Sequence, residues 1–294
     1  MVTGSILITG GSGQVGGAVA RLATSLGYDV SCPARDVLDL ADERSITEFF
    51  RATTWSHVVN CAAYTAVDQA ENDPELAFRI NAAAPAVLSR VTNEKGVPVI
   101  HVSTDYVFDG TKFGPYDEID PIAPLGVYGS SKAAGEDAIR NGNPQHAILR
   151  TAWILSAQGK NFLTTMLRIG VGKQEISVVD DQIGSPTGAD DLAKAILSVI
   201  TMSAATGKTW HVVNSGSASW HGLANHIFAS AAKAGMIVPD VRPIPTSQYP
   251  TPAKRPANSV LSTRQIEADL GLTFRPWQTV VDDIVNERMT KGSM

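Results

Sequence analysis

The chain has 294 residues, of which 44% are hydrophobic and 18% are charged, and its formal net charge at pH 7 is −5. This ordinary globular mixture, without any run of lysine and arginine, gives no electrostatic footprint for nucleic acid. The two cysteines, Cys32 and Cys61, are too few for a disulfide framework or a thiolate metal cage. No signal segment opens the chain, and no apolar run reaches the ~20 residues that span a bilayer. We therefore expect a cytoplasmic protein without a membrane or nucleic-acid partner.

The first predicted unit is a strand, a glycine turn and a helix. Ser5 to Thr9 form a short apolar run typical of a buried parallel strand, and Val15 to Leu26 show helical apolar spacing. Between them, Gly10, Gly13 and Gly16 are spaced by two residues each. Such glycines allow a sharp turn and let the backbone approach a pyrophosphate over the helix N-terminus. This arrangement favours a dinucleotide site over an ordinary glycine-rich turn.

The second predicted strand, Tyr28 to Cys32, bears on the choice of cofactor. An acidic residue at this strand's end favours a free ribose 2′-hydroxyl, whereas an arginine accepts a 2′-phosphate. No acid stands at the tip and Arg35 follows it, so NADPH is favoured over NADH, although Arg35 could equally be a solvated loop charge. Asp39 and Leu40 are placed for a contact with the adenine edge, and Asp39 could instead begin a turn.

Polar and small residues follow the next two predicted strands, His57 to Asn60 and Val97 to Ser103. Side chains just beyond the carboxyl end of a parallel strand project into the binding crevice. Thr104 could therefore donate a hydrogen bond to a carbonyl oxygen, or it could simply cap the following turn. A helix predicted from Pro74 to Glu94 carries Asn81 in its middle, where an asparagine is usually only tolerated.

Tyr128 and Lys132 lie four residues apart in a run that predicts a helix to about Arg140. This spacing places both side chains on one helix face. A fixed ammonium favours the ionised form of a nearby phenol, so the pair could exchange a proton near neutral pH. A lone Tyr-x-x-x-Lys pair is a weak signal, but here it follows the glycine turn and the Ser-Thr-Asp at a strand end, in that order, which favours a catalytic pair over a solvated helix face.

The regular alternation of strands and helices loosens after the predicted strand His146 to Arg150. We expect a doubly wound parallel sheet over residues 1–150 and a smaller α/β lobe over 151–294, with some elements returning to the first domain. Within the proline-rich stretch 248–258, Arg255 could face a diphosphate or remain a solvated loop charge. The six histidines show no metal-binding spacing, so no metal site is predicted.

Several longer segments resemble the dTDP-4-dehydrorhamnose reductases, a family of extended short-chain dehydrogenases/reductases. The glycine turn and the Tyr–Lys pair occur across the superfamily. More particular are STDYVFDG at Ser103–Gly110, VDDQIGSPT at Val179–Thr187 and YPTPAKRPANS at Tyr249–Ser259. The resemblance covers nearly the whole chain. It implies hydride transfer from NADPH or NADH to the C4 ketone of dTDP-4-dehydro-6-deoxy-L-mannose, the last step of dTDP-L-rhamnose synthesis.

The same resemblance implies roles for individual residues. Tyr128 would give a proton to the C4 oxygen, Lys132 would hold the nicotinamide ribose and lower the Tyr128 pKa, and Thr104 would polarise the ketone. Asn81 would anchor Lys132 through water. The implied cofactor contacts are Gly10, Gly13, Gln14, Val15, Gly16, Arg35, Asp39, Leu40, Ala63, Tyr64, Thr65, Asn81, Ser103, Tyr128 and Lys132. The implied contacts with the nucleotide sugar are Thr104, Asp105, Val107, Tyr128, Trp153, Asn161 and Arg255.

Two other functions remain open at this point: another nucleotide-sugar 4-ketoreductase, and a non-catalytic regulatory subunit of the same fold. A 4,6-dehydratase is disfavoured, because that family carries a glutamate where Tyr106 follows Thr104-Asp105 here. Some reductases carry an acid that helps to bridge a dimer through a metal, at a position that Ala18 occupies in this chain. The resemblance therefore implies a monomer or a weak homodimer.

Overall fold

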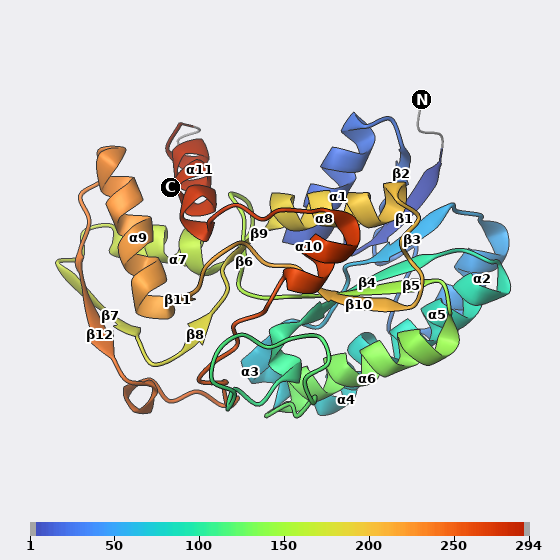
Figure 1. The fold of residues 1–294 in the computed structure, drawn as a ribbon, viewed down its shortest axis with the longest axis horizontal. Helices are drawn as coiled ribbons and strands as arrows, with labels where there is room; N and C mark the ends of the chain where they lie inside the picture. Colours follow the sequence, from blue (N-terminus) through green and yellow to red (C-terminus); the bar gives the residue numbers. More distant parts are fainter. Residues whose placement is uncertain (1–3, 291–294) are drawn as a thin grey trace.

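The computed structural model describes residues 4–290, so residues 291–294 of the predicted second lobe lie outside the described part. Its largest sheet has six strands in the order β10-β5-β4-β3-β1-β2, all parallel (Figure 1). Because β2 and β3 lie on opposite sides of β1, the strand order reverses between β1 and β3. The strands are β1 (Ser5–Thr9), β2 (Asp29–Ser31), β3 (His57–Asn60), β4 (Val99–Thr104), β5 (His146–Thr151) and β10 (Lys208–His211).

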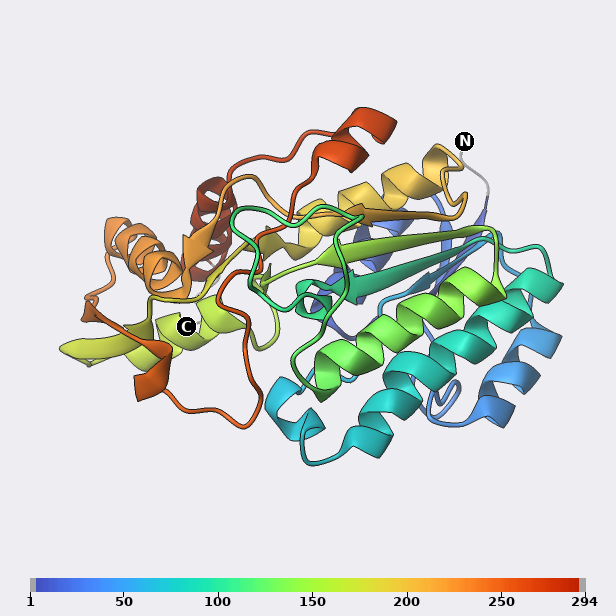
Figure 2. The same ribbon diagram turned by 60° about the horizontal axis from the view of Figure 1, so that its bottom comes forward.

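Successive residues of a strand point to opposite faces of the sheet. Because the strands of this sheet carry apolar residues on both faces, helices cover both faces. Ile6 and Ile8 belong to the core cluster on the side of α1 (Gln14–Ser25) and α8 (Ala189–Thr201). Leu7 belongs to the cluster on the opposite side. That side is covered by a row of helices, visible in Figure 2: α2 (Glu43–Ala52), α5 (Ala84–Glu94) and α6 (Val127–Gly142).

The helix predicted from Pro74 to Glu94 is interrupted by a π-turn. It consists of α4 (Pro74–Phe78), the π-turn η1 (Arg79–Ala83) and α5, and it is preceded by the short α3 (Val67–Ala70). Pro85 has no N–H with which to bond the carbonyl of Asn81. α6 crosses close to that carbonyl, and a Cβ atom at Gly135 would lie 2.0 Å from it.

A smaller lobe lies beside the sheet and has its own core. Strand β7 (Glu175–Val179) pairs in parallel with β12 (Asp240–Ile244), a strand that the sequence pattern did not predict. The helices of this lobe are α7 (Phe162–Gly170), α9 (Trp220–Lys233) and α11 (Trp277–Thr290), and they pack around one apolar cluster. Short strand pairs join β6 (Ile154–Leu155) to β9 (Thr187–Gly188), and β8 (Ile183–Gly184) to β11 (Ala218–Ser219). The remaining elements are η2 (Asp105–Val107), η3 (Thr246–Gln248) and α10 (Arg264–Leu270).

The predicted fold class, a doubly wound parallel sheet with a smaller α/β lobe, is confirmed. The second half of the chain supplies α8 and β10 to the layers of the first sheet, and the division at residue 150 stays a prediction. In residues 4–290, no helix is long and apolar enough to cross a membrane. Nor does this part of the chain group three or more His, Cys, Asp or Glu side chains in a way that could hold a metal ion.

Candidate active site

A cavity of about 720 Å³ lies at the carboxyl edge of the sheet and extends to the second lobe. A second cavity of about 510 Å³ adjoins it, and both are lined by Gly10, Ser12, Ala62 and Ala63. These residues follow β1 and β3, where the strand order reverses, and ligands of open α/β sheets bind at such a point. Together the two cavities form one elongated site.

The glycine turn is shaped for close backbone approach to a ligand. Gly10 has a φ of 71°, and its carbonyl accepts a hydrogen bond of 2.9 Å from the Gly13 N–H. A Cβ atom at Gly16 would lie 2.3 Å from the Gly10 oxygen, so a side chain there would force the turn open. No side chain caps the N-terminus of α1, which leaves its N–H groups available to an anion. The turn fits the pyrophosphate of a dinucleotide.

The smaller cavity contains the residues predicted to contact the adenosine end of a cofactor. Arg35 is exposed there and forms an ion pair of 3.4 Å with Asp39. The Asp39 carboxylate also accepts a hydrogen bond of 2.9 Å from the Ala41 N–H. The predicted residues that line this cavity are Gly10, Arg35, Asp39, Leu40, Ala63 and Tyr64.

Thr104 and Tyr128 meet at the wall of the larger cavity. Thr104 ends β4 and Tyr128 lies in the first turn of α6, and the Thr104 hydroxyl is close enough to lower the pKa of the Tyr128 phenol. Thr104 Oγ1 also donates to Asp105 Oδ1 over 3.0 Å and accepts from the Tyr106 N–H over 3.2 Å. The rings of Tyr106 and Tyr128 pack edge to face with centroids 5.6 Å apart. Both hydroxyls are therefore held in place.

The environment of Tyr128 keeps its phenol protonated. Burial raises the pKa of Tyr128 to about 12, and the nearby Thr104 hydroxyl opposes that rise. Lys132, which was expected to make the phenol easier to ionise, is not among the groups that shift this pKa, and the charge of Asp105 raises it further. A protonated phenol is the form that can give a proton to a substrate.

Lys132 is buried one helical turn beyond Tyr128. Its Nζ donates to the Val102 carbonyl over 2.7 Å and lies 3.3 Å from His101 Nε2. Burial lowers the pKa of Lys132 to about 8. Two residues of β4 thus hold the Lys132 ammonium in place.

Asn81 connects α6 to the loop that follows β3. Its amide donates to Ser131 Oγ over 3.0 Å, and it exchanges bonds of 2.8 and 3.1 Å with the backbone of Tyr64. These contacts reach the helix that carries Lys132 rather than Lys132 itself. The π-turn directs the Asn81 side chain toward this loop and away from the wall of either cavity.

The second lobe contributes an aromatic wall to the larger cavity. Trp153 has a φ of 44° and its ring is stacked on that of Trp220, with centroids 3.4 Å apart. A Cβ atom at Gly184 would lie 2.4 Å from the Trp153 ring, so glycine is needed behind it. Asn161 caps α7, and its amide donates to Gln14 Oε1 over 2.8 Å, which links this lobe to the glycine turn.

Three residues that line this cavity have a buried side-chain oxygen with no hydrogen-bond partner within residues 4–290. These oxygens are Oγ of Ser103, Oδ2 of Asp105 and Oγ1 of Thr151, at or beside the ends of the neighbouring strands β4 and β5. Burial raises the pKa of Asp105 to about 6. Unpaired buried polar atoms at a cavity wall suit a polar ligand, because such groups are otherwise costly. The predicted residues that line this cavity are Gly10, Gly13, Gln14, Val15, Gly16, Ala63, Thr65, Ser103, Thr104, Asp105, Tyr128, Lys132, Trp153 and Asn161.

Two residues predicted to contact the substrate are not among those lining either cavity. Val107 is fully buried in an apolar cluster with Phe108. The Arg255 guanidinium forms two bonds with the Asp68 carboxylate, of 2.9 and 3.1 Å. This fork joins the proline-rich segment to α3, whose first residue, Val67, lines the larger cavity.

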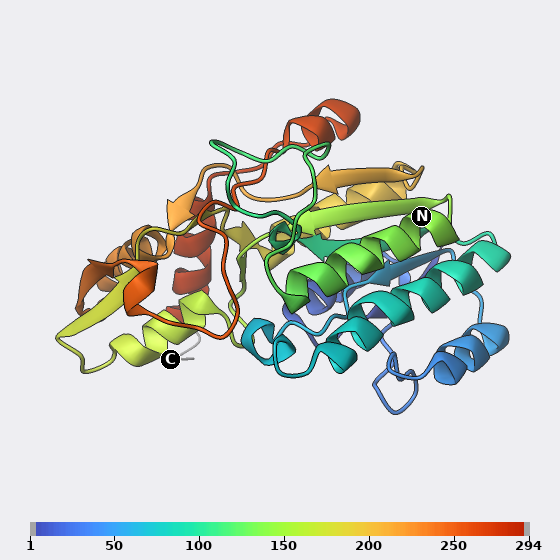
Figure 3. The same cartoon turned by 90° about the horizontal axis from the view of Figure 1, so that it is seen from below.

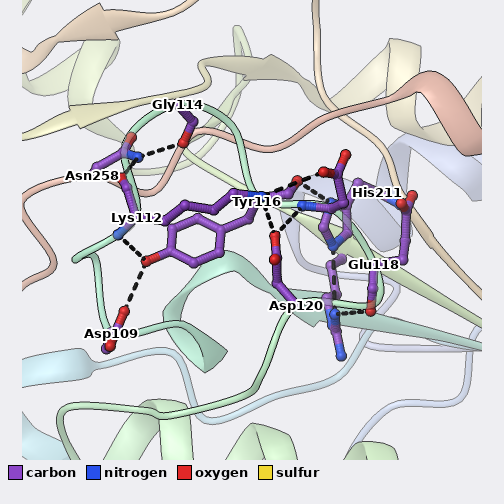
Figure 4. A network of polar contacts seen from close by, with 10 residues as sticks. Asp109, Lys112, Gly114, Tyr116, Glu118, Asp120, His211 and Asn258 are labelled. Atoms are coloured by element: carbon purple, nitrogen blue, oxygen red, sulfur yellow. Dashed lines mark hydrogen bonds and ion pairs between the residues drawn. The ribbon is translucent and has the colours of Figure 1, made fainter.

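The loop over residues 109–126 is fixed in place by a network of polar contacts (Figure 4). The Tyr116 hydroxyl donates to Asp109 over 2.8 Å, and the Asn258 amide donates to the carbonyls of Lys112 and Gly114 over 2.8 Å each. Figure 3 shows this green loop beside the orange-red segment that contains Asn258, between the two lobes. The network joins parts of the chain that are distant in sequence.

Sequence reasoning did not find three features of the site. Trp220 stacks behind Trp153 but belongs to no motif. His101 lies beside Lys132, yet an alternating strand pattern marks it only as a core position. The third feature is the buried pair of Glu136 and Arg150, whose fork-shaped contact has distances of 2.9 and 2.8 Å. In the sequence, the only signal of this pair was the helical spacing of Glu136 from Lys132 on α6.

Taken together, the doubly wound sheet, the glycine turn and the Thr104–Tyr128–Lys132 group define a short-chain dehydrogenase/reductase. A family model described as the RmlD substrate binding domain matches residues 4–290, and the chain belongs to this family.

Known proteins of similar sequence and structure agree with this assignment. A dTDP-4-dehydrorhamnose reductase of Burkholderia thailandensis is 41% identical over 97% of this chain and 99% of that protein. The crystal structure of a dTDP-4-dehydrorhamnose reductase from Clostridium acetobutylicum has a TM-score of 0.92 at 35% identity, covering 96% of this chain and 99% of that one. The enzyme of the same name from Bacillus anthracis, solved in complex with NADP, has a TM-score of 0.92 at 33% identity, covering 97% and 100%. The family resemblance expected from the sequence is confirmed.

Proposed function

We propose that this protein is a dTDP-4-dehydrorhamnose reductase, which reduces the C4 ketone of dTDP-4-dehydrorhamnose to dTDP-L-rhamnose with NADPH or NADH. The observation that carries the proposal is that Thr104 and Tyr128 meet at the wall of a cavity that continues into the glycine turn. The names and the close structural similarity of the relatives support the same reaction.

The residues of the chain fit a nicotinamide cofactor. Gly10 to Gly16 would hold its pyrophosphate, and Arg35, Asp39 and Leu40 would lie at its adenosine end. When bound, the reduced nicotinamide supplies the hydride. The absence of an acid at the tip of β2, together with the NADP complex of the Bacillus anthracis relative, favours NADPH.

In the proposed mechanism, Thr104 and Tyr128 act on one substrate oxygen. Thr104 turns its hydroxyl proton from Asp105 Oδ1 to the C4 carbonyl and so polarises the carbonyl. As C4 gains the hydride, Tyr128 gives its phenolic proton to the oxygen that becomes the hydroxyl, which leaves a phenolate on the enzyme. The positive charge of Lys132, one helical turn away, stabilises that phenolate.

The two walls of the cavity would orient the nucleotide sugar. Asp105, beside Thr104, has an unpaired oxygen for a sugar hydroxyl, and the Trp153 ring offers a flat apolar surface. Asn161 would contact the nucleotide sugar from the same side of the cavity as Trp153. For Arg255 we propose an indirect role: by holding Asp68, it keeps the segment over the diphosphate end in place.

The test is an assay of nicotinamide oxidation with dTDP-4-dehydrorhamnose as substrate. We expect turnover with the dTDP sugar, a lower kcat/KM with the UDP form, and a higher kcat/KM with NADPH than with NADH. Preference for a different 4-keto nucleotide sugar would point to another 4-ketoreductase. Cofactor binding without turnover of any sugar would point to a regulatory subunit and would overturn the proposal.

The cytoplasmic location and the monomeric or weakly dimeric state are part of this proposal. Ala18, the position at which metal-bridged relatives carry an acid, is buried in the core between α1 and α8. A methyl group there offers no ligand to a bridging metal. Sedimentation velocity with and without a chelator would show whether any dimer depends on a metal.

A further inference from the structure

A short segment of the second lobe, residues 158–161, lies against the helix that follows the glycine turn. At one end of the segment, the Arg21 guanidinium of α1 donates to Gln158 Oε1 over 3.0 Å. At the other end, the Asn161 amide donates over 2.8 Å to Oε1 of Gln14, the first residue of α1. The segment is therefore docked on α1 at both of its ends.

Contacts within the second lobe fix the backbone of this segment. Gly159 has a φ of 74°, a left-handed conformation that glycine adopts without strain. Its carbonyl accepts a hydrogen bond of 3.1 Å from Thr164 Oγ1, and the Thr164 N–H donates to Asn161 Oδ1 over 3.0 Å. Lys160 stands between these two anchored residues, so the position from which its side chain extends is well defined.

Lys160 lines the larger cavity together with the residues of the glycine turn. Its side chain is exposed, and within residues 4–290 it forms no hydrogen bond or ion pair. The other cations that line the two cavities are engaged, because Lys132 donates to a backbone carbonyl of β4 and Arg35 is paired with Asp39. Among the described residues, Lys160 is thus the cation of this site that is available to a ligand.

The charge of the expected ligand is not balanced by the glycine turn. A pyrophosphate carries negative charge on both of its phosphates, and residues 10–16 include no lysine or arginine. The uncapped N–H groups of α1 offer only the partial positive charge of a helix N-terminus. A lysine can supply the missing charge from the opposite wall, because an ammonium acts on phosphate as a point charge and needs no fixed geometry.

We propose that Lys160 binds the pyrophosphate of the cofactor from the second lobe, so that the cofactor is held between the two lobes. The docking of residues 158–161 on Gln14 favours this pyrophosphate over the diphosphate of the nucleotide sugar, since Gln14 belongs to the glycine turn. The inference rests on the proposed function for the kind of cofactor, a nicotinamide dinucleotide. It does not depend on which sugar is reduced.

The first test is the dissociation constant of NADPH, measured by the fluorescence of the cofactor without any nucleotide sugar. We expect Lys160→Gln to raise this Kd by about three- to tenfold, because a contact between charged groups is lost but water weakens such contacts near the surface. Lys160→Arg keeps the positive charge, and we expect it to restore most of the affinity. A Kd in Lys160→Arg as high as that in Lys160→Gln would contradict a role of the charge.

A matched control separates a local contact from a change of net charge. Lys173 stands in the exposed turn after α7 and lines neither cavity. Lys173→Gln removes the same charge from the same lobe, and we expect its Kd for NADPH to equal that of wild type. The affinity of Lys160→Gln should also fall less steeply with added salt than that of wild type, since one screened attraction is missing.

Two further ligands identify the phosphate that Lys160 contacts. NADH has the same pyrophosphate as NADPH but lacks the 2′-phosphate, so we expect Lys160→Gln to weaken both cofactors by the same factor. A loss for NADPH alone would assign Lys160 to the 2′-phosphate and overturn the proposal. A weaker affinity for dTDP with unchanged affinity for both cofactors would assign it to the nucleotide sugar, and this would also overturn the proposal.

The outcomes for Lys160 and for the reaction can be told apart. Equal Kd values of wild type and Lys160→Gln for both cofactors would refute the role of Lys160, while turnover of the 4-keto sugar would still support the proposed function. A raised Kd in Lys160→Gln, in a protein that turns over no 4-keto sugar, would contradict the proposed function and leave the role of Lys160 intact.

Discussion

Thr104 and Tyr128 lie together at the wall of the larger cavity, although one ends a strand and the other lies in the first turn of a helix. Their approach depends on Gly129, because a Cβ atom there would lie 2.2 Å from the Tyr106 carbonyl and 2.9 Å from Pro124 Cβ. A glycine directly after Tyr128 therefore lets α6 begin against the end of β4. The reacting groups are brought together by backbone contact rather than by flexible side chains.

Removing the Tyr128 hydroxyl should abolish the proton donor and leave the fold intact. We expect Tyr128→Phe to lower kcat by about 10²–10⁴-fold, the usual contribution of a general acid, with an unchanged melting temperature. Tyr106→Phe is the matched control, since it keeps the edge-to-face ring contact and removes a neighbouring hydroxyl. Equal turnover of Tyr128→Phe and wild type would exclude Tyr128 from the mechanism.

Thr104 should contribute through its hydroxyl and not through its methyl group. We expect Thr104→Ala to lower kcat by about ten- to a hundred-fold, because a hydrogen bond to a charge that develops in the transition state is lost. Thr104→Ser should retain most of the activity. Steady-state kinetics of both variants test this role. If Thr104→Ser loses as much activity as Thr104→Ala, the hydroxyl is not the active group.

Arg255 should act on substrate binding more than on the chemical step. We expect Arg255→Ala to raise KM for the nucleotide sugar more than it lowers kcat, because the segment held by Asp68 loses its fork-shaped contact. Asp68→Asn weakens the same contact and keeps the arginine, so it should raise KM by a smaller factor. A fall in kcat at constant KM in Arg255→Ala would contradict this role.

The buried pair of Glu136 and Arg150 should be important for stability and for its dependence on pH. Glu136→Gln leaves the Arg150 charge buried without its partner, and we expect a loss of roughly 3–5 kcal/mol in the free energy of unfolding. Denaturant unfolding measures this change. Glu48→Gln, in an exposed pair with Arg44, is the control and should leave stability unchanged within error.

The sign of the pH effect follows from the carboxyl pKa. Burial alone would raise the pKa of Glu136, but the hydrogen bonds and charge of Arg150 outweigh it and hold the pKa below its usual value. Because the pKa is lowered in the folded state, Glu136 stabilises that state at pH values above the ordinary glutamate pKa of ~4.3. That contribution is lost as the pH falls through the folded pKa, so wild type should lose stability on acidification in a way that Glu136→Gln does not. Parallel acid dependence in the two proteins would contradict this account.

The sequence by itself determined the local units. Apolar strand runs, the spacing of Gly10, Gly13 and Gly16, and the Tyr128–Lys132 interval predicted a doubly wound sheet and its cofactor turn, because these signals depend on residues close together in the chain. The family segments added the substrate class. The pattern also placed Thr104 correctly at a strand end, since the carboxyl edge of a parallel sheet is where such side chains meet.

Only the tertiary structure decided which distant groups became neighbours. The pairing of β12 with β7, the stacking of Trp220 on Trp153 and the contact of Arg255 with Asp68 join residues whose local sequence carries no mark of the partner. The pKa of Tyr128 likewise follows from burial, which the Tyr–Lys spacing could not reveal. Hydrogen bonds and desolvation depend on distances in space. Asn60 contacts both Thr9 and His101 only because β1, β3 and β4, from separate parts of the chain, lie in register.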